Sequence, residues 1–381
     1  MDHIESLNFL ESLKAKGWDL SLDRMEKLLA MMGNPEEGMD YVHIAGTNGK
    51  GSVAAMLATV LHKAGYSTGL ATSPHLIKIN ERFWVDGEHI TDDELAALVS
   101  EHKDSLKGSG ATYFEAVTAL QFMHFKQKCV KIAVMEVGLG GRLDATNVIT
   151  PLVSVITNIG LEHIGWLGDT IPEIAAEKAG IIKPRVPVVT GAEGEALQVI
   201  KRVASKMRSP VTEVRDKSVI KPGLDGEFQR KNALIVQKVI DQLKLKYPVK
   251  PETLRDGIQE TRWPGRMQRI NNYLLDSAHN LHAMKTVIDD FPSGAVAVVG
   301  ILKDKDYKGM IHVLEKKASR FIFCEPKTER ACPAELLARH CTKPHEIIKS
   351  VKKALEKAKD EKLVLVTGSC YTVGEALKVL N

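Results

Sequence analysis

Residues 43–52 read HIAGTNGKGS, a glycine-rich stretch between an apolar segment and a helical pattern. The common phosphate-binding loop has a glycine, four free positions, and then Gly-Lys-Ser/Thr. Here Ile44 stands where the leading glycine belongs, and Gly51 separates Lys50 from the hydroxyl of Ser52. The stretch is therefore either a variant phosphate loop or a glycine turn that contains a solvated lysine.

The position of this stretch favours the phosphate loop. Residues 41–46 are predicted as a buried strand, and residues 52–65 as a helix that ends at Gly65. Backbone N–H groups at a helix N-terminus point toward a bound anion, and glycines let phosphates approach the backbone closely. A lysine supplies charge for the β- and γ-phosphates, and a hydroxyl can reach Mg²⁺. The residues expected around a nucleotide here are Gly46, Thr47, Asn48, Gly49, Lys50, Gly51 and Ser52.

Elsewhere, short runs rich in Val and Ile alternate with helical patterns, which is typical of βαβ units and a mainly parallel sheet. The further strands expected in the first part of the chain are 68–73, 131–137 and 151–159. A helix is expected over 171–180. Two more helices begin with predicted capping boxes, which pair Thr91 with Glu94 and Thr112 with Glu115.

The second part of the chain repeats this pattern. The stretch 191–230 is polar and weakly patterned, and it gives no clear prediction of helix or strand. A second α/β series follows WPGR (263–266), whose Pro-Gly pair is the candidate hinge. Its expected strands are NYLLDS (272–277), AVAVVG (295–300), RFIFCE (320–325) and KLVLVTGS (362–369). We therefore predict an α/β protein with domains 1–266 and 267–381.

Composition narrows the class of protein. The 381 residues are 44% hydrophobic and 26% charged, as in soluble globular proteins, with a net charge of only +4. Neither a nucleic-acid partner nor a membrane is expected, because basic residues are dispersed and no apolar run reaches a membrane span. The N-terminus lacks a secretory signal, and the five cysteines show no C-x-x-C spacing. These features favour a cytosolic protein.

Three polar residues fall at ends of the predicted parallel strands: Ser73, Glu136 and His163. Ligands bind off the carboxyl ends of such strands, and Mg²⁺ takes a few protein oxygens while it keeps several waters. Glu136 is the strongest candidate, because a charge that closes an apolar strand is costly to bury. Taken singly, Ser73 can also be a turn residue before Pro74, and His163 a loop histidine.

Two further features need weighing. The loop GLGGRLDATN (138–147) fails the dinucleotide fingerprint, because Leu143 stands where the third glycine belongs. Its Arg142 and Asp144 suit a polar substrate better. Lys178 lies in the last turn of a predicted helix, where a lysine commonly complements the helix dipole.

Taken together, these motifs resemble the folylpolyglutamate synthase and dihydrofolate synthase family, ATP-dependent amide ligases related to the Mur ligases. The matching motifs run in order from about residue 17 to 374: HIAGTNGKGS, TSPHL with NERF, EVGLGGRLDATN, LEH with LGDT and EKAGIIKP, WPGR, LDSAHN and VTGSCYTVGE. The resemblance implies a P-loop-containing, Mur-ligase-like central domain with a mainly parallel sheet. It also implies a smaller, Rossmann-like C-terminal domain and a monomer.

The resemblance also assigns site residues. The ATP loop would include Gly49, Lys50 and Ser52, and further ATP contacts would come from Asn232, Arg266 and Asp276. The Mg²⁺ ligands would be Ser73, Glu136 and His163, with Lys178 carbamylated to bind a second Mg²⁺. His279 would lie near the γ-phosphate. The pterin site would be lined by Leu143, Asp144 and Ala145.

The implied reaction has two steps. ATP phosphorylates a carboxylate of a folate or of dihydropteroate, and the amino group of L-glutamate then displaces phosphate. The stretch WDLSLDR (18–24) resembles a pterin-site segment of bifunctional members, but Ser21 replaces a glycine, so one activity or two remain open. A Mur-type ligase with another acceptor is the first alternative. The second is a nucleotide-binding protein without ligase activity, against which the full set of expected metal ligands argues.

Overall fold

The computed structural model describes residues 1–16, 21–163 and 165–381, so part of the stretch 18–24 lies outside the described residues. These residues form two compact units. The first unit contains 1–74, 79–222 and 231–261, and the second contains 75–78, 223–230 and 262–381. The second unit therefore includes two short segments that precede its main part in the sequence.

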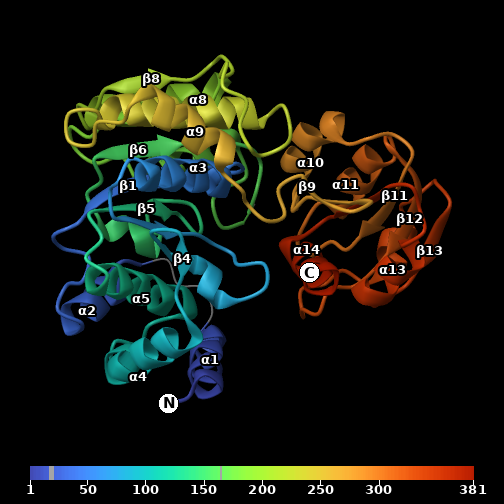
Figure 1. The fold of residues 1–381 in the computed structure, drawn as a ribbon, viewed down its shortest axis with the longest axis horizontal. Helices are drawn as coiled ribbons and strands as arrows, with labels where there is room; N and C mark the ends of the chain where they lie inside the picture. The colour runs from blue at the N-terminus through green and yellow to red at the C-terminus, as the bar shows by residue number, and fades with distance from the viewer. Residues whose placement is uncertain (17–20, 164) are drawn as a thin grey trace. The chain divides into compact units, whose positions relative to one another are not determined.

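The first unit is built on a sheet of eight strands within the described residues, in the order β4-β3-β2-β5-β1-β6-β7-β8 (Figure 1). The six strands β2, β5, β1, β6, β7 and β8 pair in parallel, in that order. Strands β3 and β4 extend the sheet beyond β2 as an antiparallel edge. The strands are β1 Asp40–Ala45, β2 Thr68–Ala71, β3 Phe83–Val85, β4 Glu88–His89, β5 Ile132–Glu136, β6 Val153–Ile156, β7 Val188–Thr190 and β8 Val211–Glu213. The predicted, mainly parallel sheet is confirmed.

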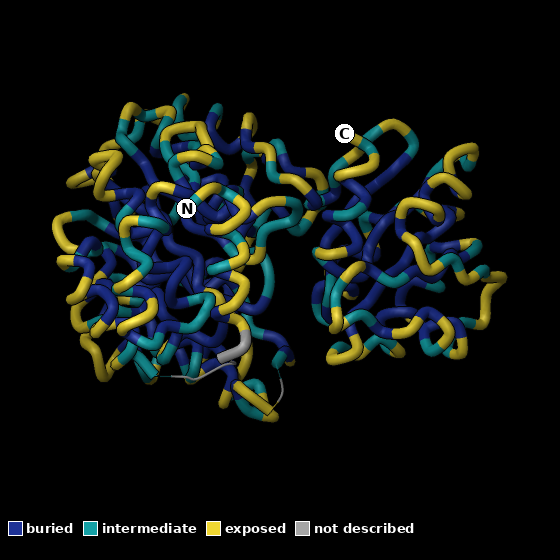
Figure 2. Tube along the Cα trace, turned by 90° about the horizontal axis from the view of Figure 1, so that it is seen from below, coloured by how far each residue is buried: buried dark blue, intermediate teal, exposed yellow. Residues whose placement is uncertain are grey.

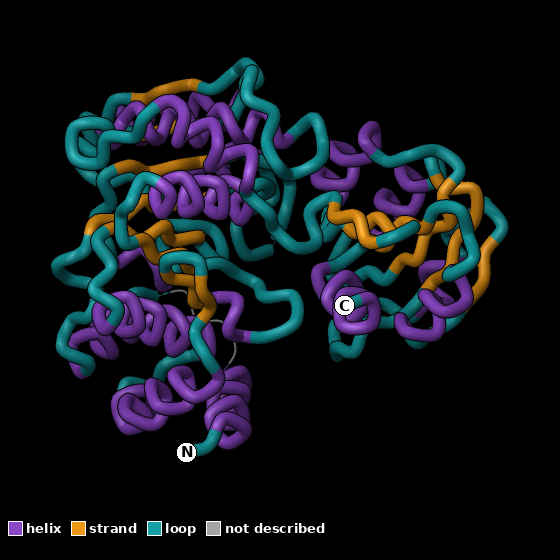
Figure 3. The backbone as a smooth tube through the Cα atoms, viewed as in Figure 1, coloured by secondary structure: helices purple, strands orange, loops and turns teal. Residues whose placement is uncertain are grey.

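Helices cover this sheet, as Figure 3 shows. Tyr41 of β1 and Met135 of β5 share one hydrophobic cluster with α1, α2, α4 and α5, whereas α3 contacts β2, β5 and α9. The helices are α1 His3–Ser12, α2 Asp23–Met31, α3 Lys50–Lys63, α4 Asp92–Gly108, α5 Tyr113–Gln127, α6 Ile171–Ala179, α7 Gly194–Lys206, α8 Gln229–Leu243 and α9 Pro251–Glu260. Short 3₁₀ helices span Leu13–Lys16, Ile79–Arg82 and Ala145–Val148. The described part of the chain has no helix both long and apolar enough to cross a bilayer.

The elements predicted for this unit are all present, and the structure adds others that the sequence analysis did not predict. The two capping boxes form as predicted at the starts of α4 and α5. Helix α3 begins at Lys50, two residues before the predicted start. The stretch 191–230 contains α7 and β8, which the sequence did not predict. The apolar residues of α7 recur at helical spacing and pack into the core, so this helix did have a signal in the sequence: Ala196, Leu197, Val199, Ile200, Val203 and Ala204.

The second unit has a sheet of six described strands, in the order β13-β12-β11-β14-β10-β9. All pair in parallel except β9, which is antiparallel to β10. Its elements are β9 Gln268–Ile270, β10 Tyr273–Leu275, α10 Leu281–Val287, a 3₁₀ helix Ile288–Asp290, β11 Ala295–Val299, α11 Tyr307–Leu314, β12 Ala318–Phe323, α12 Ala334–Ala338, β13 His345–Ile347, α13 Val351–Ala358, β14 Val364–Thr367 and α14 Cys370–Leu380. The four predicted strands are confirmed.

One hydrophobic cluster joins the sheet to α10, α11 and α12, and another joins it to α13 and α14. Figure 2 shows the buried residues inside each unit.

Candidate active site

The strand order of the first sheet places the expected site loops along one edge. Strands β2, β5, β1 and β6 are neighbours and run parallel, so their carboxyl ends share that edge. Ser73 follows β2, Glu136 ends β5, and His163 comes after β6. The backbone N–H of Ser73 donates to Oε2 of Glu136 at 3.1 Å. The phosphate loop follows β1 and therefore lies between these groups.

The phosphate loop leads directly into α3. Gly49 precedes the helix in the left-handed region, with φ of 82°, and no side chain in the described residues caps the helix. The Lys50 ammonium donates to the carbonyl oxygens of Gly46 at 3.0 Å and Thr47 at 3.3 Å. Ser52 is buried in the first turn. A helix N-terminus and a lysine thus meet at one loop, as an anion site requires.

The loop after β6 holds the phosphate loop in place. Asn158 accepts the Thr47 N–H at its carbonyl and the Asn48 N–H at Oδ1, both at 2.9 Å. The Thr157 hydroxyl donates to the Asn48 carbonyl at 2.6 Å. A Cβ at Gly46, whose φ is 148°, would lie only 1.9 Å from Thr157 Oγ1. Only glycine therefore fits at position 46.

Asn232, near the start of α8, lies against the same loop. It is buried, and a Cβ at Gly49 would lie 2.8 Å from its Oδ1 atom. Asn232, which was predicted to contact ATP, therefore lies next to the phosphate loop although the two are far apart in the sequence.

Lys178 is buried beneath the phosphate loop rather than exposed at the end of its helix. Its ammonium donates to the Gly46 carbonyl at 3.0 Å. Burial lowers the pKa of Lys178 to about 7, helped by the charge of Lys50 and opposed by Glu162 and Asp144. The helix-dipole interpretation does not explain a bond across 132 residues to another loop. Instead, a substantial fraction of this amine is neutral near pH 7.

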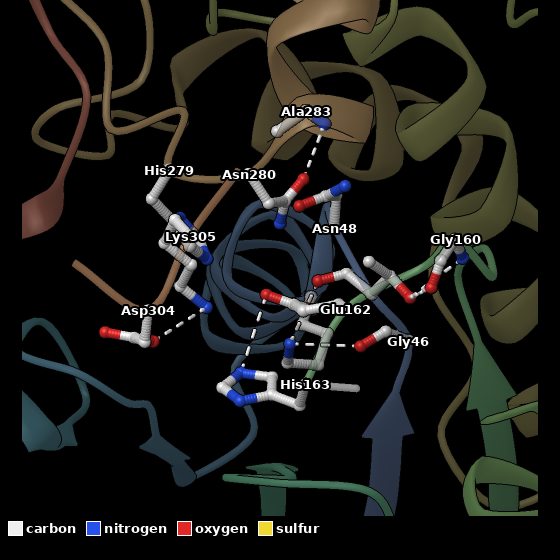
Figure 4. Close-up of polar contacts among 12 residues, drawn as sticks. Gly46, Asn48, Gly160, Glu162, His163, His279, Asn280, Ala283, Asp304 and Lys305 are labelled. Atoms are coloured by element: carbon white, nitrogen blue, oxygen red, sulfur yellow. Dashed lines mark hydrogen bonds and ion pairs between the residues drawn. The ribbon is translucent and has the colours of Figure 1, made fainter. Parts of the chain in front are cut away.

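Glu162 and His163 lie beside each other at the same edge (Figure 4). His163 has a left-handed φ of 52°, and its Nε2 atom is 3.6 Å from Oε1 of the buried Glu162. Within the described residues, no three or more His, Cys, Asp and Glu side chains form a metal-binding group. The expected ligand set does not need one, since it combines Glu136 and His163 with a serine and a carbamylated lysine. Mg²⁺ is commonly held by one or two carboxylates and several waters, and the Ser73–Glu136 pair fits that pattern.

The loop 138–147 is held from within by Asp144, which is buried. Its Oδ2 atom accepts the Leu139 N–H at 2.8 Å, and its Oδ1 atom accepts both the N–H (3.0 Å) and the hydroxyl (2.5 Å) of Thr146. Burial raises the pKa of Asp144, although these hydrogen bonds oppose the shift. Ala145 is also buried and Leu143 is half-buried, so Asp144 shapes the loop rather than facing outward.

The end of α6 supports this second loop. The Arg142 N–H donates to the Glu177 carbonyl at 2.9 Å. A Cβ at Gly141 would lie 2.9 Å from the carbonyl oxygens of both Glu177 and Lys178. The last turn of α6 therefore contacts the loop 138–147 through its backbone and the phosphate loop through its lysine.

The second unit has a polar cluster after β10. The carboxylate of Asp276 is buried and accepts the N–H groups of Met267 at 3.0 Å and Ala278 at 2.9 Å. Burial raises the pKa of Asp276, while the nearby charges of Arg266 and His279 oppose the shift. Arg266, predicted at the hinge, therefore lies in one cluster with Asp276 and His279, which were predicted in the second domain.

Comparison with known proteins identifies the family of the chain. Residues 44–219 match the Mur ligase middle domain, and residues 265–370 match the Mur ligase glutamate ligase domain. The dihydrofolate synthase/folylpolyglutamate synthase of Bacillus subtilis is 35% identical, over 94% of this chain and 95% of its own length. The chain belongs to the dihydrofolate synthase/folylpolyglutamate synthase family.

Solved structures of this family superpose closely. Folylpolyglutamate synthase from Mycobacterium tuberculosis, complexed with ADP and AMPPCP, has a TM-score of 0.91 at 28% identity, covering 100% of this chain and 99% of its own. Escherichia coli FolC, in complex with DHPP and ADP, also reaches 0.91 at 30% identity, covering 100% and 97%. The fold of this dihydrofolate synthase/folylpolyglutamate synthase family member is thus that of nucleotide-binding relatives.

Sequence reasoning missed several residues of this family member's site. Thr157 and Asn158, which hold the phosphate loop, were not singled out, although they lie near the end of the predicted strand 151–159 and directly follow β6 in the structure. Their signal was positional, because a loop that follows a strand beside β1 must lie beside the phosphate loop. The second unit also has a largely buried lysine side chain that the sequence analysis did not single out, that of Lys305. Its side chain is only 8% exposed, and its ammonium lies 3.8 Å from Asp304 (Figure 4).

Proposed function

We propose that this chain is an ATP-dependent ligase that attaches L-glutamate to a folate through an acyl phosphate. The observation that carries the proposal is the buried Lys178 amine against Gly46, at the sheet edge that also holds Ser73 and Glu136. A protein that only binds nucleotide can use a metal-binding carboxylate, but it has no need of a buried lysine beneath its phosphate loop. Family membership supports the acceptor, because the E. coli relative was solved in complex with DHPP and ADP.

In this proposal the phosphate loop binds ATP. The N-terminus of α3 and Lys50 hold the phosphates, Ser52 and Ser73 face them with hydroxyls, and Asn232 supports the turn at Gly49. Asp276, Arg266 and His279 are further nucleotide contacts, with His279 near the γ-phosphate. Phosphoryl transfer depends mainly on positioning and on charge neutralisation, which this set of residues supplies.

Mg²⁺ would be held by Ser73, Glu136 and His163, and a second ion by carbamylated Lys178. When bound, Mg²⁺ neutralises the charge that develops on the phosphoryl oxygens. Only a neutral amine reacts with CO₂, and a lysine pKa of about 7 makes that form accessible. A carbamate converts the amine into an anionic oxygen ligand, which suits Mg²⁺.

The acceptor would lie against the loop 138–147, with Leu143 and Ala145 as lining residues and Asp144 as the internal support of the loop. We propose residues 1–266 as the ATP-binding domain and 267–381 as the glutamate-ligase domain. We further propose that the enzyme works as a monomer in the cytosol.

Side-by-side assays test the function. Purified protein is incubated with ATP, Mg²⁺ and L-glutamate, and with either tetrahydrofolate or dihydropteroate. We expect ADP release that requires both acceptor and glutamate, and products heavier by one or more glutamyl units in mass spectrometry. ATP hydrolysis that ignores glutamate would instead favour a nucleotide-binding protein without ligase activity. Product from dihydropteroate would show that the enzyme is bifunctional.

A further inference from the structure

His43 is a fully buried histidine in β1, three residues before Gly46. Side chains alternate along a strand, so His43 shares its face of the sheet with Tyr41 and Ala45. Both of those neighbours pack into hydrophobic clusters, yet His43 places an imidazole among them. Its Nε2 atom lies 2.8 Å from the hydroxyl of Thr146, in the loop 138–147.

The direction of each hydrogen bond follows from the donors available. The Thr146 hydroxyl has one proton, and it donates that proton to Oδ1 of Asp144, which accepts backbone N–H groups at both oxygens. Toward His43 the hydroxyl can therefore only accept. Nε2 of His43 must carry a proton, which leaves Nδ1 as a bare acceptor. Burial and the charge of Lys183 lower the pKa of His43 to about 3, so the ring stays neutral.

The Nδ1 atom of His43 is buried and, in the described residues, has no hydrogen-bond partner. A buried acceptor without a partner destabilises the folded state. An apolar side chain at this position would avoid that loss, so folding stability does not explain the histidine. The hydrogen bonds that link His43 Nε2 through Thr146 to Asp144 explain it instead. Asp144 fixes the loop 138–147, because it accepts the backbone N–H groups of Leu139 and Thr146.

We propose that His43 is a positioning residue for the folate acceptor, which holds Thr146 and Asp144 in the conformation that shapes the loop 138–147. This inference rests on the proposed function, in which that loop lines the acceptor site. Because β1 leads directly into the phosphate loop, the same strand sets the geometry of both loops. His43 itself contacts neither substrate, and it acts through Thr146.

Two substitutions at this position separate positioning from packing. His43→Gln keeps an N–H donor at a similar distance from the backbone, whereas His43→Leu removes the donor and also the unpartnered acceptor. We expect His43→Leu to raise the acceptor KM about tenfold while the KM for ATP changes less than about twofold. Its thermal midpoint should equal or exceed that of the parent protein. His43→Gln should restore the acceptor KM to near the parent value.

Hydrogen exchange gives a readout that does not depend on catalysis. The amides of Leu139 and Thr146 donate to Asp144, so they should exchange faster in His43→Leu than in the parent protein or in His43→Gln. Thr118→Val is the matched control, since Thr118 is another fully buried residue whose hydroxyl lacks a partner in the described residues. It should leave both KM values and the exchange of this loop unchanged.

Several results would overturn the proposal. One is a His43→Leu variant with parent-like acceptor KM and loop exchange. Another is a lower thermal midpoint with equal rises in both KM values, which would indicate a purely structural role. A His43→Gln variant as impaired as His43→Leu would also count against it. If the parent protein fails to ligate glutamate, the proposed function fails, and the exchange experiment still decides whether His43 orders the loop.

Discussion

The phosphate loop and the loop 138–147 both contact the last turn of α6, but other residues hold each loop in its conformation. The phosphate loop is fixed from outside, by Thr157 and Asn158 of the loop after β6. The loop 138–147 is fixed from inside, by the carboxylate of its own Asp144. Substitutions that loosen the first loop should impair nucleotide use. Substitutions that loosen the second should impair acceptor binding and leave nucleotide binding intact.

The largest effect is expected from Lys178→Ala, which removes the amine that donates a hydrogen bond to the phosphate loop at Gly46. We expect kcat to fall about 100- to 1,000-fold, because charge stabilisation at the transferred phosphoryl group is lost. Circular dichroism and thermal unfolding should remain those of a folded protein. Lys206→Ala is the matched control, since Lys206 also lies in the last turn of its helix but is exposed. A Lys178→Ala variant with near-normal turnover would refute the carbamate role.

Gly46→Ala tests the external support of the phosphate loop. The added Cβ would lie 1.9 Å from Thr157 Oγ1, so the loop must shift by an ångström or more. We expect kcat/KM for ATP to fall about 100-fold, as measured by initial rates at varied ATP. Gly38→Ala is the control, because Gly38 also has positive φ but no atom within 4 Å of the new Cβ. Equal losses in the two variants would mean that backbone strain, not the contact with Thr157, is responsible.

The sequence predicted part of the difference between these two loops, and the parts it missed have physical reasons. The phosphate loop and the strand ends at Ser73 and Glu136 were predictable, because glycine spacing and buried charges are local signals. Helix α7 was missed although its apolar residues recur at helical spacing, because the surrounding stretch 191–230 is polar as a whole. The support from Thr157 was missed because it depends on which strands are neighbours, a property of the sheet. The internal role of Asp144 was also hidden, since a carboxylate that accepts its own loop's N–H groups looks in sequence like a substrate ligand.

Asp144→Asn tests the internal support. The amide keeps the size of the carboxyl group but replaces one of its two oxygens by an NH₂ group, and each of those oxygens accepts a backbone N–H. We expect the acceptor KM to rise about tenfold and the KM for ATP to stay near the parent value. Asp216→Asn, at an exposed position, should change neither. A parallel rise in both KM values would contradict the separation of the two loops.

The smallest expected effect is a pH dependence at Lys178. Its pKa is lowered to about 7, so the amine is mostly protonated below that pH and mostly neutral above it. After removal of CO₂, the same concentration of dissolved CO₂ should restore ligase activity about threefold faster at pH 7.5 than at pH 6.5, since only the neutral amine reacts with CO₂ to form a carbamate. Activity that is indifferent to CO₂ would exclude the modification while leaving the hydrogen bond to Gly46 in place.

The central claim is that ATP is used to activate the acceptor's carboxylate, and oxygen transfer tests it directly. The acceptor is prepared with ¹⁸O in the carboxylate that receives glutamate, and the released phosphate is analysed by mass spectrometry after one turnover. An acyl phosphate leaves one acceptor oxygen on phosphorus, so the account predicts phosphate that carries one ¹⁸O atom per amide bond formed. Unlabelled phosphate, released together with glutamylated product, would contradict it.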